Sequence, residues 1–178
     1  MNEAGVPYLT VLTNPTTGLP GGKLIEDQLR RIMREREWAL LYMGIRDLEP
    51  FNEAYGFVAS ADVLRFVTMV MNQAVDAEGT AEDFIGHIDG DDFVLITDAS
   101  RAKELADAIK GRFDKEIATF YSFRDREAGY VTVDAPGKEP SQAELMTLAV
   151  GMITSQNGPF SDIREITEAA AEARRAAS

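Results

Sequence analysis

The feature that most constrains the fold is a continuous apolar run from Trp38 to Ile45. Two shorter apolar runs follow later in the chain, at Phe84 to Ile88 and at Phe93 to Thr97. A continuous apolar run of this length is typical of a strand that is covered on both faces. The two shorter runs flank Asp89-Gly90-Asp91-Asp92, and an Asp-Gly turn between apolar segments predicts a hairpin. The sequence therefore predicts one buried strand and a separate antiparallel pair.

Amphipathic helices separate these strands. Apolar side chains recur at three- and four-residue spacings in three segments, and this spacing is typical of a helix with one buried face. The segments are 24–33, a second that begins at Ser60 or Ala61 and ends near 76–79, and 102–113. Pro50, Asn52 and Gly56 are expected to break up the short segment before the second helix.

The C-terminal part supplies a minor strand at Tyr130–Val133 and a further strand at Leu145–Ile153, which Gly151 interrupts. Asp162, with Glu165 three residues later, predicts a capping box at the start of an alanine-rich helix. Without the ends, the order is strand, helix, strand, strand, helix, strand, which matches the split βαβ arrangement of ferredoxin-like folds. We therefore expect an α+β fold with a ferredoxin-like or palm-type βαββαβ core, whose mostly antiparallel central sheet is flanked by helices.

Length and residue usage indicate a single domain over residues 1–178, with a turn-rich lead-in loop at 1–22 and a core at 23–178. A chain of this length buries roughly 70% of its unfolded surface, so it needs no disulfide or metal for stability. The absence of cysteine excludes disulfides, thiolate zinc sites and cysteine nucleophiles. With His87 as the single histidine, two-histidine metal sites are also excluded.

The charge balance is 30 acids against 18 bases, a net charge of -12. Such a chain repels phosphate backbones and anionic lipids, so we expect no nucleic-acid partner. No apolar run reaches the roughly 18 residues of a spanning helix, and the N-terminus lacks the profile of a secretory signal. We expect a cytoplasmic protein without membrane insertion.

The predicted topology brings two segments together. In a split βαβ unit the third strand lies antiparallel between the first two, so the hairpin turn at 89–92 sits beside the end of the first strand at 44–47. In palm-type nucleotidyl transferases this corner holds the carboxylates that bind magnesium and the triphosphate. Taken alone, the hairpin acids are explained more simply as solvated turn residues, since Asp and Gly are the usual turn formers.

Four segments change that balance, because together they resemble the GGDEF family of diguanylate cyclases over nearly the whole chain. Each is short, but all four occur in the family's order. They are 14–20 (Asn-Pro-Thr-Thr-Gly-Leu-Pro), 51–56 (Phe-Asn-Glu-Ala-Tyr-Gly), 88–93 (Ile-Asp-Gly-Asp-Asp-Phe) and 148–152 (Leu-Ala-Val-Gly-Met).

The resemblance implies roles for several residues of this sequence. Asp91 and Asp92 match the catalytic acids of the signature motif, and Gly90 precedes them in it. Gly90 and Arg46 are expected to contact a bound nucleotide. Asn52 matches the family's guanine-contacting asparagine, and Arg174 corresponds to a lysine of the last helix near the triphosphate. The activity that the resemblance implies is the condensation of two GTP to cyclic di-GMP with Mg²⁺, by two domains that meet face to face.

The sequence departs from the family at several of these positions. The strand that ends in Asp-Ile-Asp in active members ends here in Gly44-Ile45-Arg46, so only Asp91 and the Ile45 carbonyl remain as metal ligands. Ala61 stands where an acid contacts the base, and Asp62 is one helical position away from it.

Two further positions differ. Glu49 replaces a basic residue near the triphosphate, and Thr80 replaces the arginine of the inhibitory Arg-x-x-Asp motif, whose acid Asp83 is kept. A threonine hydroxyl does not reproduce the bidentate contact of an arginine with phosphate. We therefore expect no tight binding of cyclic di-GMP at that surface.

Three hypotheses follow. The first is a degenerate GGDEF domain that acts as a regulatory, nucleotide-sensing or interaction module; the second is an active diguanylate cyclase; the third is a dimerisation domain without a ligand. The implied partners are GTP or another guanine nucleotide, a second copy of the chain, and a sensor or receiver domain in a longer parent chain. In the first hypothesis Arg46 is expected to lie beside Asp91 and to occupy the space of the magnesium ion.

Overall fold

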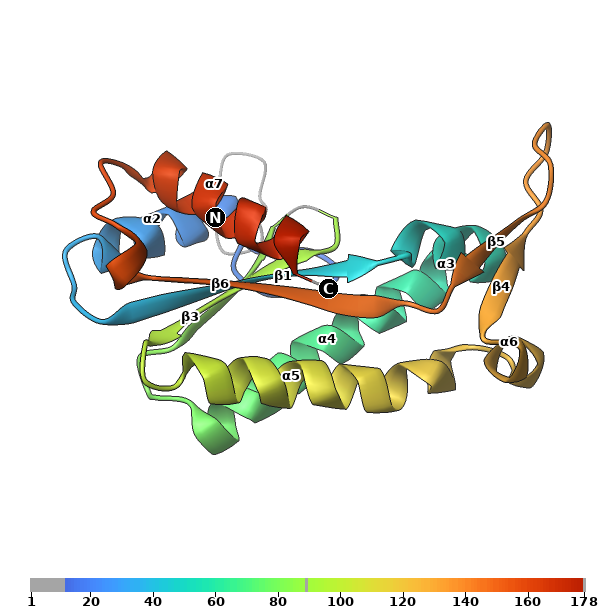
Figure 1. Ribbon diagram of the computed structural model, residues 1–178, viewed down its shortest axis with the longest axis horizontal. Coiled ribbons are helices and arrows are strands. Elements are labelled where there is room, and N and C mark those ends of the chain that lie inside the picture. The colour runs from blue at the N-terminus through green and yellow to red at the C-terminus, as the bar shows by residue number, and fades with distance from the viewer. Residues whose placement is uncertain (1–11, 89, 178) are drawn as a thin grey trace, which may run out of the picture.

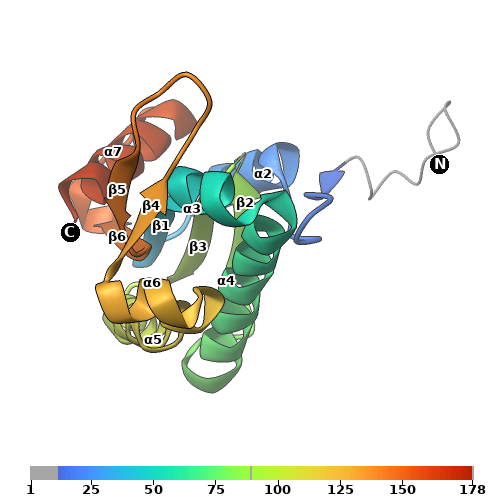
Figure 2. The ribbon, with the colours of Figure 1, turned by 90° about the vertical axis from the view of Figure 1, so that its right-hand side faces the viewer.

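The computed structural model describes residues 12–88 and 90–177. Residues 1–11, which are part of the expected lead-in loop, and Asp89 of the expected hairpin turn lie outside the described residues. A four-stranded sheet forms the centre and has helices on both faces (Figures 1 and 2). A second, two-stranded sheet projects beyond one end of the central sheet (Figure 1).

The central sheet has the strand order β2-β3-β1-β6, and its three neighbouring pairs are antiparallel. Because β3 is antiparallel to both β1 and β2, these two run parallel with β3 between them, as the split βαβ interpretation predicts. The expected α+β fold with a mostly antiparallel central sheet is confirmed. The strands are β1 (Trp38–Arg46), β2 (Phe84–Ile88), β3 (Asp92–Asp98) and β6 (Thr147–Thr154), with β4 (Tyr130–Val133) and β5 (Ser141–Glu144) in the small sheet.

Helices α4 and α5 cover one face of the central sheet, and α2 and α7 cover the other (Figure 1). Each face encloses its own apolar core, because successive strand residues point to opposite sides. Short 3-10 turns at Ile117–Phe120 and Ser155–Asn157 complete the described elements. The helices are α2 (Gly22–Ile32), α3 (Leu48–Tyr55), α4 (Phe57–Glu78), α5 (Ala102–Glu116), α6 (Phe123–Ala128) and α7 (Ile163–Ala176).

The region before α4 is more helical than the sequence indicated. Pro50 does not break it, because it lies in the first turn of α3, where a missing backbone N–H costs no hydrogen bond. Gly56 separates α3 from α4 at a φ of 93°, a conformation that favours glycine. α4 then begins at Phe57, earlier than the expected start at Ser60 or Ala61.

The C-terminal part needs two corrections. Gly151 does not interrupt a strand: β6 continues through it and pairs it with Tyr42 of β1. The expected capping box of α7 is half formed, because the Asp162 carboxylate accepts from the Glu165 amide at 3.0 Å while the Glu165 carboxylate accepts from the Ser161 amide. Among the described residues, no helix is both long and apolar enough to cross a membrane.

Candidate functional site

The corner that the sequence predicted forms where β1 ends and β3 begins. Gly44 of β1 lies directly opposite Asp92 of β3, so the hairpin meets the end of the first strand as expected. Tyr42 and Gly44 alternate with Met43 and therefore face α7, on the opposite side from α4 and α5. The polar residues of the corner thus lie between the sheet and the C-terminal turn of α7.

Arg174, in the last turn of α7, supplies the positive charge at this corner. Its Nη1 lies 3.3 Å from Oδ1 of Asp92, and the two side chains are only 26% and 20% exposed. The contact is an ion pair without hydrogen-bond geometry, and both Oδ1 of Asp92 and Nε of Arg174 are buried without a hydrogen-bond partner. The pair is therefore held by charge and packing more than by directional bonding.

Tyr42 completes this cluster. Its hydroxyl donates to Oδ2 of Asp92 at 3.1 Å, and the guanidinium carbon of Arg174 lies 5.7 Å from the centre of its ring. A cation at this distance from an aromatic face is attracted to the ring. Burial, followed by the negative charge of Asp92, raises the pKa of Tyr42 to about 12, so its hydroxyl stays a donor at neutral pH.

Two glycines make room for Arg174. A Cβ on Gly44 would overlap Nη1 of Arg174 and would lie 2.9 Å from its Cζ. A Cβ on Gly151 would collide with the α7 backbone at Ala173 and Arg174. A side chain at position 151 is therefore incompatible with the present path of α7, and one at position 44 is incompatible with the present position of the Arg174 guanidinium.

The expected pairing of Arg46 with Asp91 is wrong. The Arg46 side chain is exposed, and its guanidinium donates to the carbonyl of Ala177, just beyond α7. Free carbonyls at a helix C-terminus attract a cation, and this site holds Arg46. The counter-ion of the corner is Arg174, and its partner is Asp92.

Asp91 is half-buried beside this ion pair. Burial is the main reason that its pKa lies above the ordinary value, and the neighbouring charge of Asp92 raises it further. The hydrogen bond to its own backbone amide opposes this shift, followed by the charges of Arg174 and His87. Asp91 is thus the hairpin acid with the least compensated charge among those that the structure describes.

His87 braces the hairpin from the β2 side. It is 2% exposed, stacks on the Phe93 ring at 4.3 Å, and places Nε2 at 2.8 Å from the Gly90 carbonyl. Since a carbonyl only accepts, Nε2 carries a proton, and Nδ1 is hydrogen-bonded to the Thr17 hydroxyl at 2.9 Å. These bonds tie the lead-in turn to the hairpin, and Gly90 takes a φ of 75°, which favours glycine.

The residues expected to contact a base lie at the α3–α4 junction. Oδ1 of Asn52 accepts from the Ser60 hydroxyl at 3.0 Å, so part of its hydrogen-bonding capacity is used inside the protein. Ala61 has no polar group to offer, and Asp62 turns to Arg65 at 3.1 Å instead of replacing it. Phe57 is 79% exposed at the start of α4, which gives this surface an apolar character.

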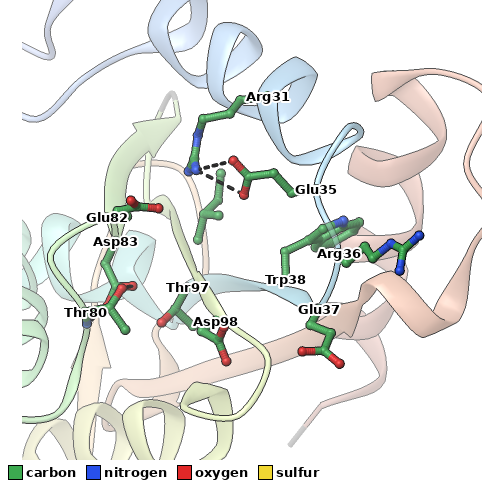
Figure 3. Close-up of a pocket in the computed structure, with 11 residues that line it drawn as sticks. Arg31, Glu35, Arg36, Glu37, Trp38, Thr80, Glu82, Asp83, Thr97 and Asp98 are labelled. Atoms are coloured by element: carbon green, nitrogen blue, oxygen red, sulfur yellow. Dashed lines mark hydrogen bonds and ion pairs between the residues drawn. The ribbon is translucent and has the colours of Figure 1, made fainter.

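The Thr80 position lies in a hollow of about 360 Å³ at the opposite end of β1 and β3 from the corner (Figure 3). Thr80 donates to Asp83 through both its amide and its hydroxyl, at 3.0 and 2.6 Å. Arg31, one of two arginines there, is bonded to Glu35 at 2.9 Å. The acidic side chains of the lining are Glu35, Glu37, Glu82, Asp83 and Asp98. The hollow is therefore acidic overall and suits phosphate poorly.

The described part of the corner does not fit a magnesium ion. Mg²⁺ requires a near-octahedral set of oxygen ligands, including carboxylates that are free to bind it. Within the ranges 12–88 and 90–177, no three acidic or histidine side chains form a group that could hold a metal. Asp92 is committed to Tyr42 and Arg174, which leaves Asp91 and the Ile45 carbonyl of the expected ligands.

The sequence predicted the corner, but the prediction assigned its cation to the wrong arginine. Arg174 was identified only as a nucleotide contact, and the roles of Tyr42 and Gly151 were missed. One signal was present in the sequence: Gly44 and Gly151 are glycines within two apolar strand segments, and a strand glycine often marks a close approach of another backbone.

Several solved structures share this fold. The coiled-coil and GGDEF domain of DgcB from Caulobacter crescentus, in complex with c-di-GMP, matches with a TM-score of 0.67 and 19% identity, covering 94% of this chain and 81% of that one. The FimX GGDEF domain from Pseudomonas aeruginosa matches with a TM-score of 0.65 and 12% identity, covering 93% of each chain. At these identities the likeness establishes the fold.

The diguanylate cyclase SiaD from Pseudomonas aeruginosa, in complex with its activator SiaC, is a third similar structure. It matches with a TM-score of 0.64 and 18% identity, and covers 92% of this chain but only 56% of SiaD. No curated protein matches this chain in sequence.

The family model described as "Diguanylate cyclase, GGDEF domain" matches residues 11–135, which is more than half of the chain. The match includes the lead-in turn, the Asn52 region and the hairpin of the corner. Together with the strand order and the placement of the hairpin acids beside β1, it shows that the chain belongs to the GGDEF domain family.

Proposed function

We propose that this chain is a catalytically silent GGDEF domain, which serves the cyclic di-GMP system as a regulatory or interaction module. The observation that carries the proposal is the position of Arg174, whose guanidinium lies where a side chain at position 44 would project and pairs with Asp92. A GGDEF cyclase needs metal-bound triphosphate at this corner. Gly44 offers no carboxylate for the metal, and the guanidinium occupies the space in which one would project.

The surroundings support the same function. Ala61 supplies no acid to the base, and the Asn52 amide oxygen is already bonded to Ser60. The loss of a hydrogen bond to a base weakens binding by about 1 to 3 kcal/mol, because a polar group of the base is left without a partner. Weakened base recognition and a missing metal ligand act on the same step, the positioning of GTP for attack.

A guanine nucleotide that binds the corner is expected to do so without Mg²⁺. Arg174 and Arg46 lie at the C-terminal end of α7, and a guanidinium contacts phosphate directly. Calorimetry with GTP, with and without Mg²⁺, measures this. A nucleotide affinity that depends strongly on Mg²⁺ would contradict the proposal.

The activity test is incubation of the chain with GTP and either Mg²⁺ or Mn²⁺, followed by mass spectrometry for cyclic di-GMP. We expect no product. An active GGDEF domain with an aspartate at the position of Gly44 is the positive control. Steady accumulation of cyclic di-GMP that Asp91→Asn abolishes would establish an active cyclase instead, and a chain that dimerises but binds no nucleotide would indicate a dimerisation domain.

Cyclic di-GMP itself is expected not to bind tightly at the Thr80 hollow. Thr80 uses its hydroxyl on Asp83, and carboxylates outnumber arginines in the lining. Calorimetry with cyclic di-GMP tests this. A complex of low-micromolar affinity or tighter that Asp83→Ala weakens would contradict it.

A further inference from the structure

We propose that Arg174 is a resident cation that takes the place of a divalent metal ion at the β1–β3 corner, and that Gly44 and Gly151 are the positions that admit it. This inference rests on the proposed function and deepens it, because it identifies the residue that closes the site to metal. It also links three positions that lie far apart in the sequence.

Gly151 lets the backbone of α7 approach β6 closely. A Cβ on Gly151 would lie 2.6 Å from Cα of Arg174, closer than non-bonded atoms approach each other. The last turn of α7 therefore rests directly on β6 at this glycine. Because of this close approach, Cα of Arg174 lies against β6.

The guanidinium of Arg174 occupies the space beside Gly44. A Cβ on Gly44 would lie 2.9 Å from both Cζ of Arg174 and Oδ1 of Asp92, and would overlap Nη1. An aspartate at position 44 and the present position of Arg174 are therefore mutually exclusive. The two residues behave as alternatives: either a carboxylate projects from position 44, or the arginine fills that space.

The positive charge of Arg174 also opposes a metal ion at this corner. Its guanidinium lies 3.3 Å from Asp92 in a partly buried site. A divalent ion at the same carboxylate would be repelled by this guanidinium at short range. The ring of Tyr42 holds the guanidinium in place from a third side.

The neighbouring Arg175 is a control that distinguishes a resident cation from a residue that only anchors the helix. It lies in the same turn of α7 and carries the same charge, but it points to solvent and pairs with Glu172 at 2.6 Å. If Arg174 only fastens α7 to the sheet, then metal affinity will not depend on it. If it is a resident cation, metal affinity will rise when Arg174 is neutralised and will not change when Arg175 is.

The test is a titration of the full chain with Mn²⁺, in which paramagnetic resonance measures the free ion at physiological ionic strength. Four proteins are compared: wild type, Arg175→Gln, Arg174→Gln, and Gly44→Asp combined with Arg174→Gln. We expect the first two to show the same weak surface binding. Arg174→Gln should bind more tightly, and the double variant should bind about tenfold more tightly than wild type, since affinity rises with the number of carboxylate ligands.

Terbium luminescence excited through tyrosine locates the added ion. Tyr42 donates to Asp92, so an ion bound at Asp92 lies close enough to be sensitised. Adding Tyr42→Phe to Arg174→Gln should remove most of the gained signal. Arg174→Lys, which keeps the charge, should bind Mn²⁺ as weakly as wild type.

Equal Mn²⁺ affinity in wild type and Arg174→Gln would overturn the inference, as would a gained terbium signal that survives Tyr42→Phe. If the double variant does not fold, the comparison of Arg174→Gln with Arg175→Gln still decides. A wild type that makes cyclic di-GMP would overturn the proposed function. A silent wild type whose Mn²⁺ affinity does not respond to Arg174→Gln would overturn this inference alone.

Discussion

The two faces of the central sheet use the same strands in different ways. Toward α4 and α5, the side chains remain apolar to the end of β1 and the start of β3, with Met43, Ile45 and Phe93 all buried. Toward α2 and α7, the apolar core ends at Tyr42, and the sheet continues with Gly44 and the ion pair of Asp92. Both faces enclose an apolar core, but among the described residues only the face toward α7 carries a partly buried ion pair at the end of the sheet.

This difference has a physical basis. A closely packed apolar face tolerates little change, because each lost methylene leaves a cavity. A face where a helix end rests on glycines is partly solvated, so charged groups there cost less. Variation in function is therefore expected on the α7 face, without a comparable loss of stability.

The largest expected effect comes from the apolar face. Met71→Ala should lower the free energy of unfolding by about 2 to 5 kcal/mol, because Met71 of α4 is fully buried in that core. Met69→Ala is the matched control in the same helix, since Met69 is 42% exposed, and should change stability by no more than about 0.5 kcal/mol. Urea denaturation measures both. Similar losses in the two variants would mean that α4 packs differently.

The second largest effect is expected where α7 packs against Gly151 on the other face of the sheet. Gly151→Ala should destabilise the fold by about 1 to 3 kcal/mol, because its methyl group collides with the α7 backbone, which has no room to shift cheaply. Gly111→Ala is the opposite case: Gly111 lies in α5 with open space around it, so alanine should stabilise by about 0.5 to 1 kcal/mol. Hydrogen exchange should show faster opening of α7 only in the first variant.

A smaller effect is expected for the ion pair. Arg174→Met should cost about 1 to 2 kcal/mol, between the values for exposed and buried pairs, because the pair is partly buried and lacks hydrogen-bond geometry. Arg175→Met should cost about 0.5 kcal/mol or less. High salt should reduce the stability loss of Arg174→Met less than it reduces the loss from breaking an exposed ion pair, because salt screens a partly buried pair less. Equal losses of stability in Arg174→Met and Arg175→Met would show that the Arg174 ion pair contributes no more than an exposed one.

The smallest effect depends on pH. The pKa of Asp91 is raised in the folded state, so its proton stabilises the fold at low pH, and this contribution is lost as the pH rises through the raised pKa. Asp91→Asn should therefore stabilise the protein at pH 7, and the gain should disappear below the ordinary pKa of 3.8. Thermal unfolding of both proteins at pH 7 and at a pH below 3.8 measures whether Asp91→Asn stabilises the protein. A loss of stability at pH 7 would show that the Asp91 carboxylate makes a favourable contact.

Local patterns were sufficient for three of the four strands of the central sheet, β1, β2 and β3. The apolar run of β1 and the two runs around the Asp-Gly turn predicted the buried strands, and the element order predicted their arrangement. The helices α3 and α6 were missed because both are short, and one carries a proline and the other a mixed-charge sequence. α6 depends on the Ser122 hydroxyl as its cap and on Gly129, at a φ of 81°, as its end.

The amino-acid sequence by itself determined that the corner exists and that Gly44 contributes no carboxylate to it. Only the tertiary structure decided which arginine pairs with the acids of the hairpin. Arg46 is adjacent to the corner in sequence, yet its guanidinium reaches the end of α7, while Arg174 comes from the last helix and lies on Asp92. The reason is packing: Gly151 fixes how closely α7 approaches β6, and that distance determines which guanidinium reaches the carboxylate.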